Sequence, residues 1–296
     1  MSLNLLESVD IDLEKLRGVL IRLEDTIIFC LAERAQFKTN DDIYSPNKME
    51  FKDGFSGSFL DWFLKEVETV HAKVRRYNSF FFIFLIFMIG NISPDEYPFT
   101  KDLPLPVLPD LDYPNLLVKN SINVNDKIKD IYINTVIQEI CEHGDDSNYG
   151  SSATRDIECL QALSRRIHYG KFVAESKFRD PKYHDTYVKL IKEQNAEAIN
   201  ELLTNEQVEK KLLDRLHKKA LIYGQDFDAL NFKVSESPSG SRPVLSEIYL
   251  NNPTVKDSEP KKNIKVDSSV VVDLYKTHVI PLTKLVEVEY LLHRLD

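Results

Sequence analysis

Two basic side chains on one predicted helix have the spacing needed to bind an elongated anion. Residues 150–177 contain no proline and could form about seven helical turns. Apolar residues recur three or four positions apart in this range, so one face of the helix would pack against a core. Arg166 and Lys177 are eleven residues apart, and at about 100° per residue they project from nearly the same face, about three turns apart. This arrangement suits a ligand with two carboxylates, although a solvated cationic helix face would show the same spacing.

Helix-period patterns dominate the rest of the chain and predict a mainly α-helical protein. Only 9 of the 296 residues are glycine, and apolar stripes with helical spacing recur along most of the sequence. The predicted helices span residues 10–34, 58–77, 124–141, 150–177, 183–203 and 268–295. The helix over 183–203 would have a break near Asn195. A further helix would follow it, capped by Thr204 or Asn205. Residues 100–114 contain four prolines and would form an ordered strap. At 296 residues the chain could bury one large core or form two small domains.

Composition and charge argue against several classes of function. The net charge is −9 and the pI about 5.4, whereas a nucleic-acid-binding protein would need a basic surface. The three cysteines show no C-x-x-C spacing, which fits small buried residues in a reducing compartment. Acidic residues near the N-terminus do not suit a signal or transit peptide, so we expect a cytoplasmic protein. No nucleophile, metal or cofactor motif is evident in the sequence.

Residues 80–89 form an unusually apolar run, F-F-F-I-F-L-I-F-M-I. This run of ten residues is too short to span a membrane, which takes about 20, and in an ordinary protein it would be a buried core segment. If it were an exposed loop, it would favour aggregation or membrane contact. A membrane-associated helical protein is therefore one alternative, which solubility without detergent would test.

Several long motifs, occurring in the same order, resemble the fungal, all-helical chorismate mutases. Residues 150–177 resemble the central helix of that family, and the two ends of the chain match it as L-R-G-V-L-I-R-L-E-D-T-I-I-F (16–29) and V-I-P-L-T-K-L-V-E-V-E-Y-L-L-H-R-L (279–295). Between them stand G-S-F-L-D-W (57–62), N-D-K-I-K (125–129) and R-L-H-K-K-A-L-I-Y-G (215–224). The resemblance implies a single-domain, all-α helix bundle over residues 1–296. It also implies that this bundle converts chorismate to prephenate in aromatic amino acid biosynthesis, without a metal or cofactor.

Two stretches depart from the family's pattern. Residues 79–92 separate the basic pair at 75–76 from S-P-D-E (93–96), which follows that pair almost directly in the family, and removing these 14 residues restores the family's spacing. Our hypothesis is a translated intron or a gene-model error, which sequencing the transcript would decide. Residues 225–267 contain many serines, prolines and asparagines and would form a longer surface loop than in the family.

The resemblance implies a set of active-site residues for a single pericyclic step. The residues expected to contact the carboxylates and the ether oxygen, and so to be catalytic, are Arg17, Arg166, Lys177 and Glu287. The residues expected to bind the rest of the substrate are Asn205, Glu209 and Thr283. Arg215 would order the region around Glu209. These roles come from the resemblance and not from the spacing of the residues.

Glu287 is the one member of this set whose role requires a particular protonation state. It would donate a hydrogen bond to the ether oxygen, which an ionised carboxylate cannot do. Burial in an apolar bundle would raise its pKa and keep it protonated. Without the resemblance, Arg17 would be read as part of a surface ion pair with Glu14 or Glu24, and Glu209 as an exposed carboxylate near a helix start.

The resemblance also implies an amino-acid effector site at the interface of a homodimer, where tyrosine would inhibit and tryptophan would activate. The residues that match its contacts are Arg75, Arg76, Asn148, Gly150, Ser151 and Thr154. From sequence alone, the two arginines could instead complement the dipole of a helix C-terminus, and Ser151 or Ser152 could cap a helix start. Asp267 stands where the family has a capping threonine and could serve as an N-cap itself.

A second alternative is a helical regulatory protein that binds an amino acid but has lost catalysis. The complete set of expected catalytic and substrate-binding residues argues against it.

Overall fold

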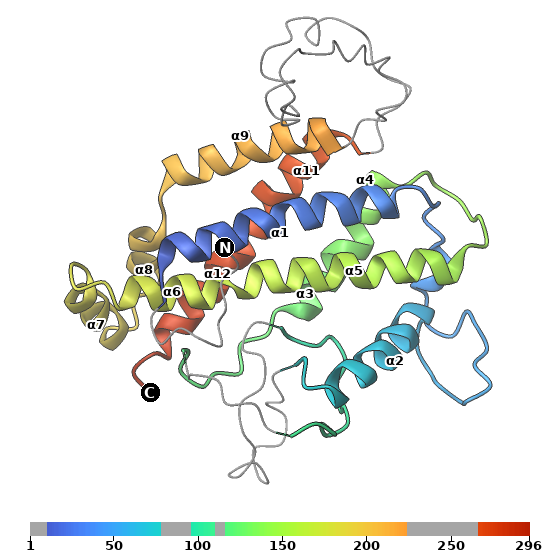
Figure 1. Ribbon diagram of the computed structural model, residues 1–296, viewed down its shortest axis with the longest axis horizontal. Coiled ribbons are helices and arrows are strands. Elements are labelled where there is room, and N and C mark those ends of the chain that lie inside the picture. The colour runs from blue at the N-terminus through green and yellow to red at the C-terminus, as the bar shows by residue number, and fades with distance from the viewer. Residues whose placement is uncertain (1–10, 78–95, 110–115, 224–265) are drawn as a thin grey trace, which may run out of the picture.

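The computed structural model describes residues 11–77, 96–109, 116–223 and 266–296. Within these residues every regular element is a helix or a helical turn, so the all-α prediction is confirmed (Figure 1). The apolar run at 80–89, the rest of the 79–92 insertion and nearly all of the 225–267 loop lie outside the described residues.

The helices follow the predicted ranges closely. Their bounds are α1 Leu13–Arg34, α2 Phe59–Lys73, α3 Asn125–Ile131, α4 Ile137–Ile140, α5 Tyr149–His168, α6 Gly170–Phe178, α7 His184–Lys192, α8 Ala196–Leu203, α9 Glu206–Tyr223, α11 Ser268–Leu274 and α12 Ile280–Leu292. A π-helical turn, Tyr132–Val136, joins α3 to α4, and a second one, Tyr275–Val279, joins α11 to α12.

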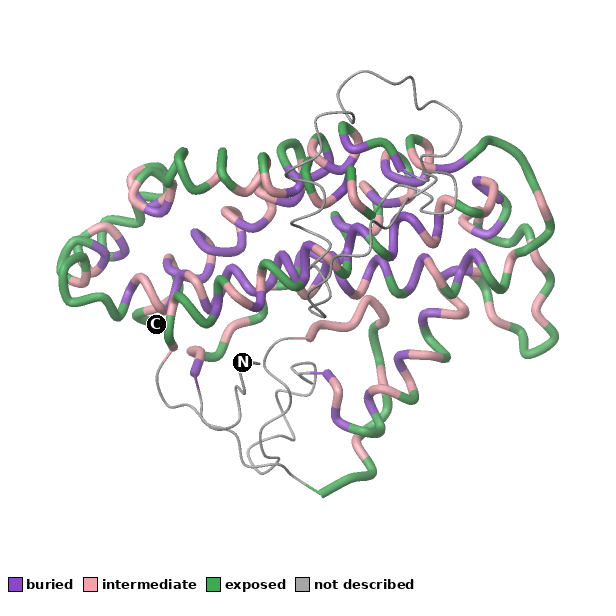
Figure 2. Tube along the Cα trace, turned by 45° about the horizontal axis from the view of Figure 1, so that its top comes forward, coloured by how far each residue is buried: buried purple, intermediate pink, exposed green. Residues whose placement is uncertain are grey.

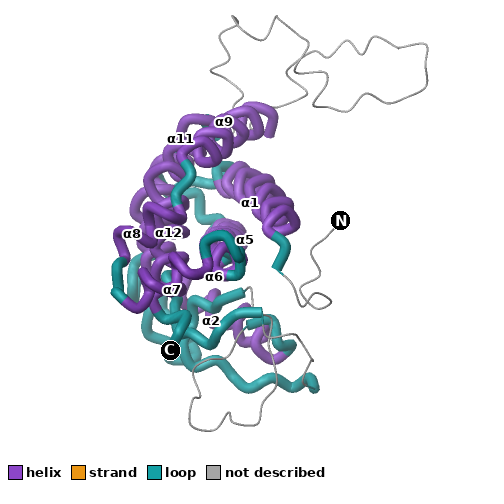
Figure 3. The backbone as a smooth tube through the Cα atoms, turned by 90° about the vertical axis from the view of Figure 1, so that its left-hand side faces the viewer, coloured by secondary structure: helices purple, strands orange, loops and turns teal. Residues whose placement is uncertain are grey.

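The long helices α1 and α5 lie side by side and form the centre of the bundle (Figures 1 and 3). Their facing residues Ile27, Leu31, Ile157 and Leu160 are almost completely buried, as the helical spacing of apolar residues predicts. Figure 2 shows buried positions concentrated along these inner helices. The segment from α11 to α12 crosses this pair, so residues from both ends of the chain reach the same core.

A buried ion pair fixes α1 against α5. Arg34 donates from Nε to Asp156 at 2.6 Å, and both side chains are fully buried. Tyr44 and Tyr132 donate their hydroxyl groups to the same carboxylate at 2.8 and 2.9 Å. Because buried charges are costly unless they are paired and hydrogen-bonded, this arrangement strongly favours one placement of the two helices.

Several helix caps agree with the sequence. Asp267 caps α11 by accepting the backbone N–H of Ser269 at 2.8 Å, and Asn195 caps α8 through the N–H of Ala198 at 3.0 Å. The carboxamide oxygen of Asn205 accepts the N–H of Val208 at 3.2 Å at the start of α9.

Three local predictions are wrong. The expected continuous helix over 150–177 is interrupted at the single residue Tyr169, which separates α5 from α6 while keeping helical φ and ψ of −58° and −16°. Neither Ser151 nor Ser152 is the N-cap of α5, which begins after Asn148; Ser152 is buried and accepts a hydrogen bond from Asn40 at 2.9 Å instead. Helix α2 ends at Lys73, so Arg75 lies beyond its last turn with a left-handed φ of 62°.

Candidate active site

Arg166 on α5 is a buried arginine whose contacts leave donor capacity for a ligand. Only 4% of the residue is exposed. Its Nη1 reaches the Thr283 hydroxyl at a long 3.5 Å, and its guanidinium carbon lies 5.9 Å from the centre of the Tyr275 ring. Its buried Nε has no hydrogen-bond partner among the described residues. An unsatisfied buried donor is costly, so this position is well suited to accept an anionic group.

Glu287 on α12 is buried beside both central cations. Burial raises its pKa to about 7, and the nearby charges of Lys177, Arg166 and Lys284 only partly oppose that rise. Glu209 of α9 is also close enough to raise the pKa of Glu287. The direction of this shift agrees with the sequence analysis, since a carboxyl group with a pKa near 7 is often protonated and able to donate a hydrogen bond.

Lys177 on α6 is half-buried and donates from Nζ to the carbonyl oxygen of Leu203 at 2.7 Å. Leu203 is the last residue of α8, so this contact orients the lysine across the site. An ammonium group has three protons to donate. Lys177 can therefore keep the bond to Leu203 while it donates to a ligand.

Lys284 is a charged residue of this site that the sequence analysis missed. Its Nζ lies 2.8 Å from a carboxylate oxygen of Glu209, which links α12 to α9. Its position between Thr283 and Glu287 was the available signal, because a residue three positions before Glu287 lies near it on a helix surface. Asn205, in contrast, is exposed at the start of α9.

Arg17 is the expected catalytic residue that the structure places apart. Its guanidinium pairs with Glu14 on the exposed side of α1, the surface ion pair that sequence alone allowed. The second carboxylate considered for it, Glu24, instead accepts two hydrogen bonds from Arg215 of α9 at 2.8 and 2.7 Å. Arg215 therefore fastens α9 to α1, in keeping with the ordering role expected of it.

Comparison with known proteins identifies the family. The family described as "Chorismate mutase type II" matches residues 148–288. The chorismate mutase of Saccharomyces cerevisiae is 42% identical over 292 residues, which cover 97% of this chain and 96% of the yeast protein. The chain belongs to the chorismate mutase family.

Solved structures of the chorismate mutase family share the fold. The Candida albicans chorismate mutase Aro7p, crystallised as a complex with L-Trp, matches with a TM-score of 0.79 and 37% identity over 99% of this chain and 96% of that one. AtCM1 with tyrosine bound in its allosteric site matches with a TM-score of 0.75 and 39% identity over 98% of this chain and 99% of that one.

One half of the effector site expected from the chorismate mutase resemblance follows α2. Arg75 is buried and donates from Nε to the carbonyl oxygen of Leu108 at 2.6 Å. Arg76 donates to the carboxylate of Glu96, which also lies 3.7 Å from Nη1 of Arg165 on α5. In this chain Arg76 therefore pairs with the carboxylate of Glu96. The family resemblance leads us to expect the carboxylate of an amino-acid effector at that position.

The other half lies at the start of α5. Asn148, Gly150, Ser151 and Thr154 are all exposed there. The segment after α2 contacts α5 much further along that helix. There Gln161 donates to the Tyr77 hydroxyl at 3.1 Å, and Arg165 lies close to Glu96. At 1.5 Å per residue, these contacts lie about 16 to 22 Å along α5 from Gly150. One copy of the chain does not bring the two halves together.

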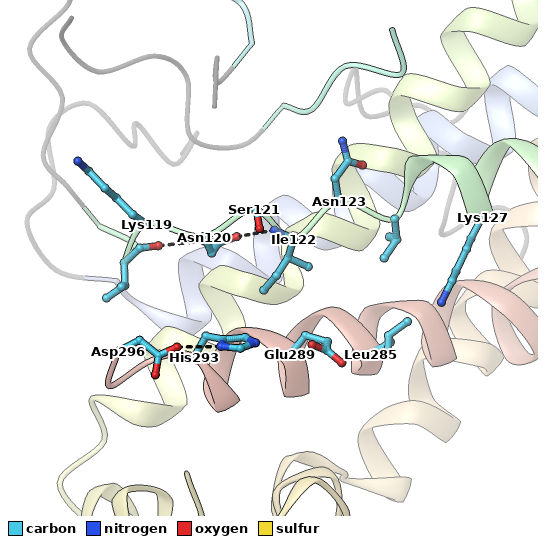
Figure 4. A pocket seen from close by; sticks show the side chains of 12 residues that line it. Lys119, Asn120, Ser121, Ile122, Asn123, Lys127, Leu285, Glu289, His293 and Asp296 are labelled. Carbon is cyan, nitrogen blue, oxygen red and sulfur yellow. Dashed lines mark hydrogen bonds and ion pairs between the residues drawn. The ribbon is translucent and has the colours of Figure 1, made fainter. Parts of the chain in front are cut away.

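A cavity of about 670 Å³ lies on a different side of α12 (Figure 4). It is partly open and is lined by the segment 118–124 and by Leu285, Glu289 and His293, which recur every four residues on one helix face. Glu287 lies about 200° around the helix from Leu285, and none of the expected catalytic residues lines this cavity. We therefore do not assign it to the chorismate mutase active site.

Neither a metal cluster nor a membrane-spanning helix occurs among the described residues. No group of three or more His, Cys, Asp or Glu side chains there could hold a metal ion. None of the helices in the described ranges is both long and apolar enough to cross a membrane. The three cysteines, Cys30, Cys141 and Cys159, are buried and free.

Proposed function

We propose that this chain catalyses the rearrangement of chorismate to prephenate at the site formed by α5, α6, α9 and α12. The observation that carries the proposal is the buried grouping of Arg166 with Glu287. The Nε of Arg166 has no hydrogen-bond partner in the described part of the chain, and the pKa of Glu287 is raised to about 7. Family membership supports the reaction, and this grouping supports the location.

The reaction is one pericyclic step in which a C–O bond breaks as a C–C bond forms. It needs no nucleophile, since the electrons move within the substrate. The protein contributes by holding a compact substrate conformer and by stabilising negative charge that develops on the ether oxygen. In this proposal Lys177 and protonated Glu287 donate to that oxygen, where a single donor can stabilise the transition state by about 3–4 kcal/mol.

The charges of the site suit a substrate with two carboxylates. Arg166 would bind one carboxylate and Arg17 the other, while Asn205 and Glu209 would contact a carboxylate and the hydroxyl group. Thr283, at a long 3.5 Å from Arg166, would orient the guanidinium. A neutral Glu287 adds no negative charge beside the dianion, whereas an ionised one would repel it.

Arg17 must leave Glu14 to take part in substrate binding. Its side chain is 46% exposed and that of Glu14 is 78% exposed. Exposed ion pairs of this kind contribute only about 0–1 kcal/mol. A substrate carboxylate in a partly dehydrated site would therefore compete easily for the Arg17 guanidinium.

Conversion of chorismate by the purified chain tests the function. We expect the absorbance of chorismate to fall and prephenate to form, and the variant Arg166→Ala to lose nearly all of this activity. A folded, inactive natural chain that still binds tyrosine would refute the catalytic proposal and favour the amino-acid-binding regulatory protein. A chain that needs detergent to remain in solution would favour the membrane-associated alternative.

We also propose that the protein is a homodimer regulated by tyrosine as an inhibitor and tryptophan as an activator. The separation of the two halves of the effector site within one chain supports an interface location. A cluster of exposed apolar side chains beside Arg75 also supports it; its members are Val70, Val74, Leu105, Val107 and Leu108. The Candida relative bound to L-Trp and AtCM1 bound to tyrosine supply the effector chemistry.

The proposal treats residues 1–296 as one domain. Helices from both ends of the chain support this, because α1 and α12 both pack against the α5–α6 segment. We place the protein in the cytoplasm because its three cysteines are free and buried. Fractionation of cell extracts would test that location.

A further inference from the structure

The break between α5 and α6 lies between the two central cations of the site. Arg166 precedes it, Lys177 follows it, and Gly170 is the first residue of α6. Figure 1 shows α12 crossing this part of the chain. Gly170 is buried against α12, so its surroundings bear directly on the active site.

A side chain at Gly170 would be in abnormally tight contact with α12. A Cβ atom there would lie 3.0 Å from the carbonyl oxygen of Thr283, 3.1 Å from Cγ2 of Thr283 and 3.1 Å from Cγ of Glu287. Non-bonded carbon atoms are most stable about 3.5–4.0 Å apart, so a methyl group would be too close by about 0.4 Å or more. Because one of the atoms is backbone, rotation of a side chain cannot relieve the whole contact.

A second contact prevents α6 and α12 from simply moving apart. The buried carboxylate of Glu175 accepts the hydroxyl of Tyr290 at 2.7 Å and two N–H groups of Arg294 at 2.6 and 2.9 Å. Glu175 lies five residues after Gly170, about 7.5 Å along α6. With this end of α12 held, a methyl group at Gly170 would tilt the other end, which carries Thr283 and Glu287, away from α5 and α6.

We propose that Gly170 is a positioning residue for the rearrangement: because it lacks a side chain, α12 approaches the break between Arg166 and Lys177 closely enough to shield Glu287 from water beside both cations. The effect on turnover rests on the proposed function. The placement of Glu287 does not rest on the proposed function, since this placement is a property of the protein without substrate.

Gly170→Ala tests the proposal. Alanine favours helix more than glycine does, so any loss must come from the contact with α12. We expect water to reach Glu287 and its pKa to fall towards that of an exposed glutamate, about 4.3. The neighbouring groups Arg166, Lys177, Glu209, Lys284 and Tyr187 are unchanged by the substitution. We expect kcat to fall about tenfold or more, because small displacements of catalytic groups are costly.

Gly18→Ala is the matched control. Gly18 lies within α1, and a Cβ there would meet nothing within 4 Å. This variant makes the same chemical change in a helix without a clash, so we expect it to leave both turnover and the pKa of Glu287 unchanged.

The measurement is a ¹³C NMR titration of carboxyl-labelled glutamate without substrate, with the Glu287 resonance assigned from its loss in Glu287→Gln. A lower pKa in Gly170→Ala than in Gly18→Ala supports the proposal. Equal pKa values in the two variants would overturn it, even if Gly170→Ala turned over slowly. If the natural chain does not convert chorismate, the proposed function fails while this comparison still decides the role of Gly170.

A double variant decides the matter if Gly170→Ala does not fold. Glu287→Ala removes one of the atoms that the new methyl group would strike. Recovery of the helical circular dichroism and cooperative unfolding in Gly170→Ala/Glu287→Ala would support direct contact. Because the contacts with Thr283 remain, we expect this recovery to be partial. A double variant that is no more folded than Gly170→Ala would show that the methyl group does not strike Glu287 and would overturn the specific role.

Discussion

Arg166 is the residue whose surroundings most narrowly limit its role. It is buried, its hydrogen bond to Thr283 is long, and its Nε has no hydrogen-bond partner within the described chain. Such an arginine contributes little to the free energy of folding, because among the described residues its guanidinium forms no ion pair that would offset the cost of removing its charge from water. Its retention in the core is better explained by ligand binding than by stability.

The first prediction separates these two roles with Arg166→Met. Methionine has a similar volume and no charge, so we expect unchanged or increased stability to urea, together with a loss of kcat/KM of about 100-fold or more. The control is Arg34→Met, which strands the buried Asp156 carboxylate and should cost about 3–5 kcal/mol of stability. Destabilisation of the two variants by similar amounts would contradict this account.

The second prediction concerns stability as a function of pH. The folded-state pKa of Glu287 is raised from 4.5 to about 7, so its favourable contribution is fully present below pH 4.5 and is lost as the pH rises through 7. Ionisation of the buried carboxyl should cost about 3 kcal/mol. Urea unfolding at pH 5 and pH 8 should show Glu287→Gln gaining stability relative to the natural chain at the higher pH. The same difference at both values would refute the raised pKa.

At the scale of elements, the sequence predicts that Asp267 starts a helix by capping it, and substitution of this residue tests that cause. Asp267 precedes α11 and accepts hydrogen bonds from the backbone and hydroxyl of Ser269, both at 2.8 Å. The third prediction is that Asp267→Ala lowers the free energy of unfolding by about 1 kcal/mol, as the loss of an N-cap does. Asp267→Asn, which can still accept, should lose much less. Equal losses in chemical denaturation would show that the cap is not the cause.

The sequence predicted the helices well where the apolar spacing and the cap residues of a single helix were sufficient. Apolar spacing located α1 and α5, and cap residues located the starts of α9 and α11. It did not show the interruption at Tyr169, which is next in sequence to the close approach of α12 at Gly170, a contact between distant segments. The prediction that Ser151 or Ser152 caps α5 also failed. Ser152 instead accepts a hydrogen bond from Asn40, which lies in another part of the chain.

The candidate site shows the same division. The helix spacing of Arg166 and Lys177 was readable from sequence, while the roles of Glu287, Glu209 and Asn205 came from resemblance. The ion pair of Lys284 with Glu209 depends on how α12 meets α9. No local pattern contains that packing, so only the structure could show it.

At the scale of the whole molecule, the proposed effector site would need a second copy of the chain to bring its separated residues together. The fourth prediction uses two variants that each damage one half of the expected site, Arg76→Ala and Thr154→Glu. Each homodimer should lose inhibition by tyrosine. A hybrid dimer purified with two affinity tags should regain it, because one interface then combines an intact Arg76 with an intact Thr154. Continued insensitivity of the hybrid would place both residues in one subunit's site, or in none.

The pH dependence of kcat/KM for chorismate tests the central claim most directly. The account requires a protonated Glu287, whose pKa is about 7 in the free protein. We predict that kcat/KM of the natural chain falls as the pH rises through about 7, and that this fall is absent in Glu287→Gln, whose amide donates at every pH. The same descending limb in both proteins would contradict the account, because some other group would then control the reaction.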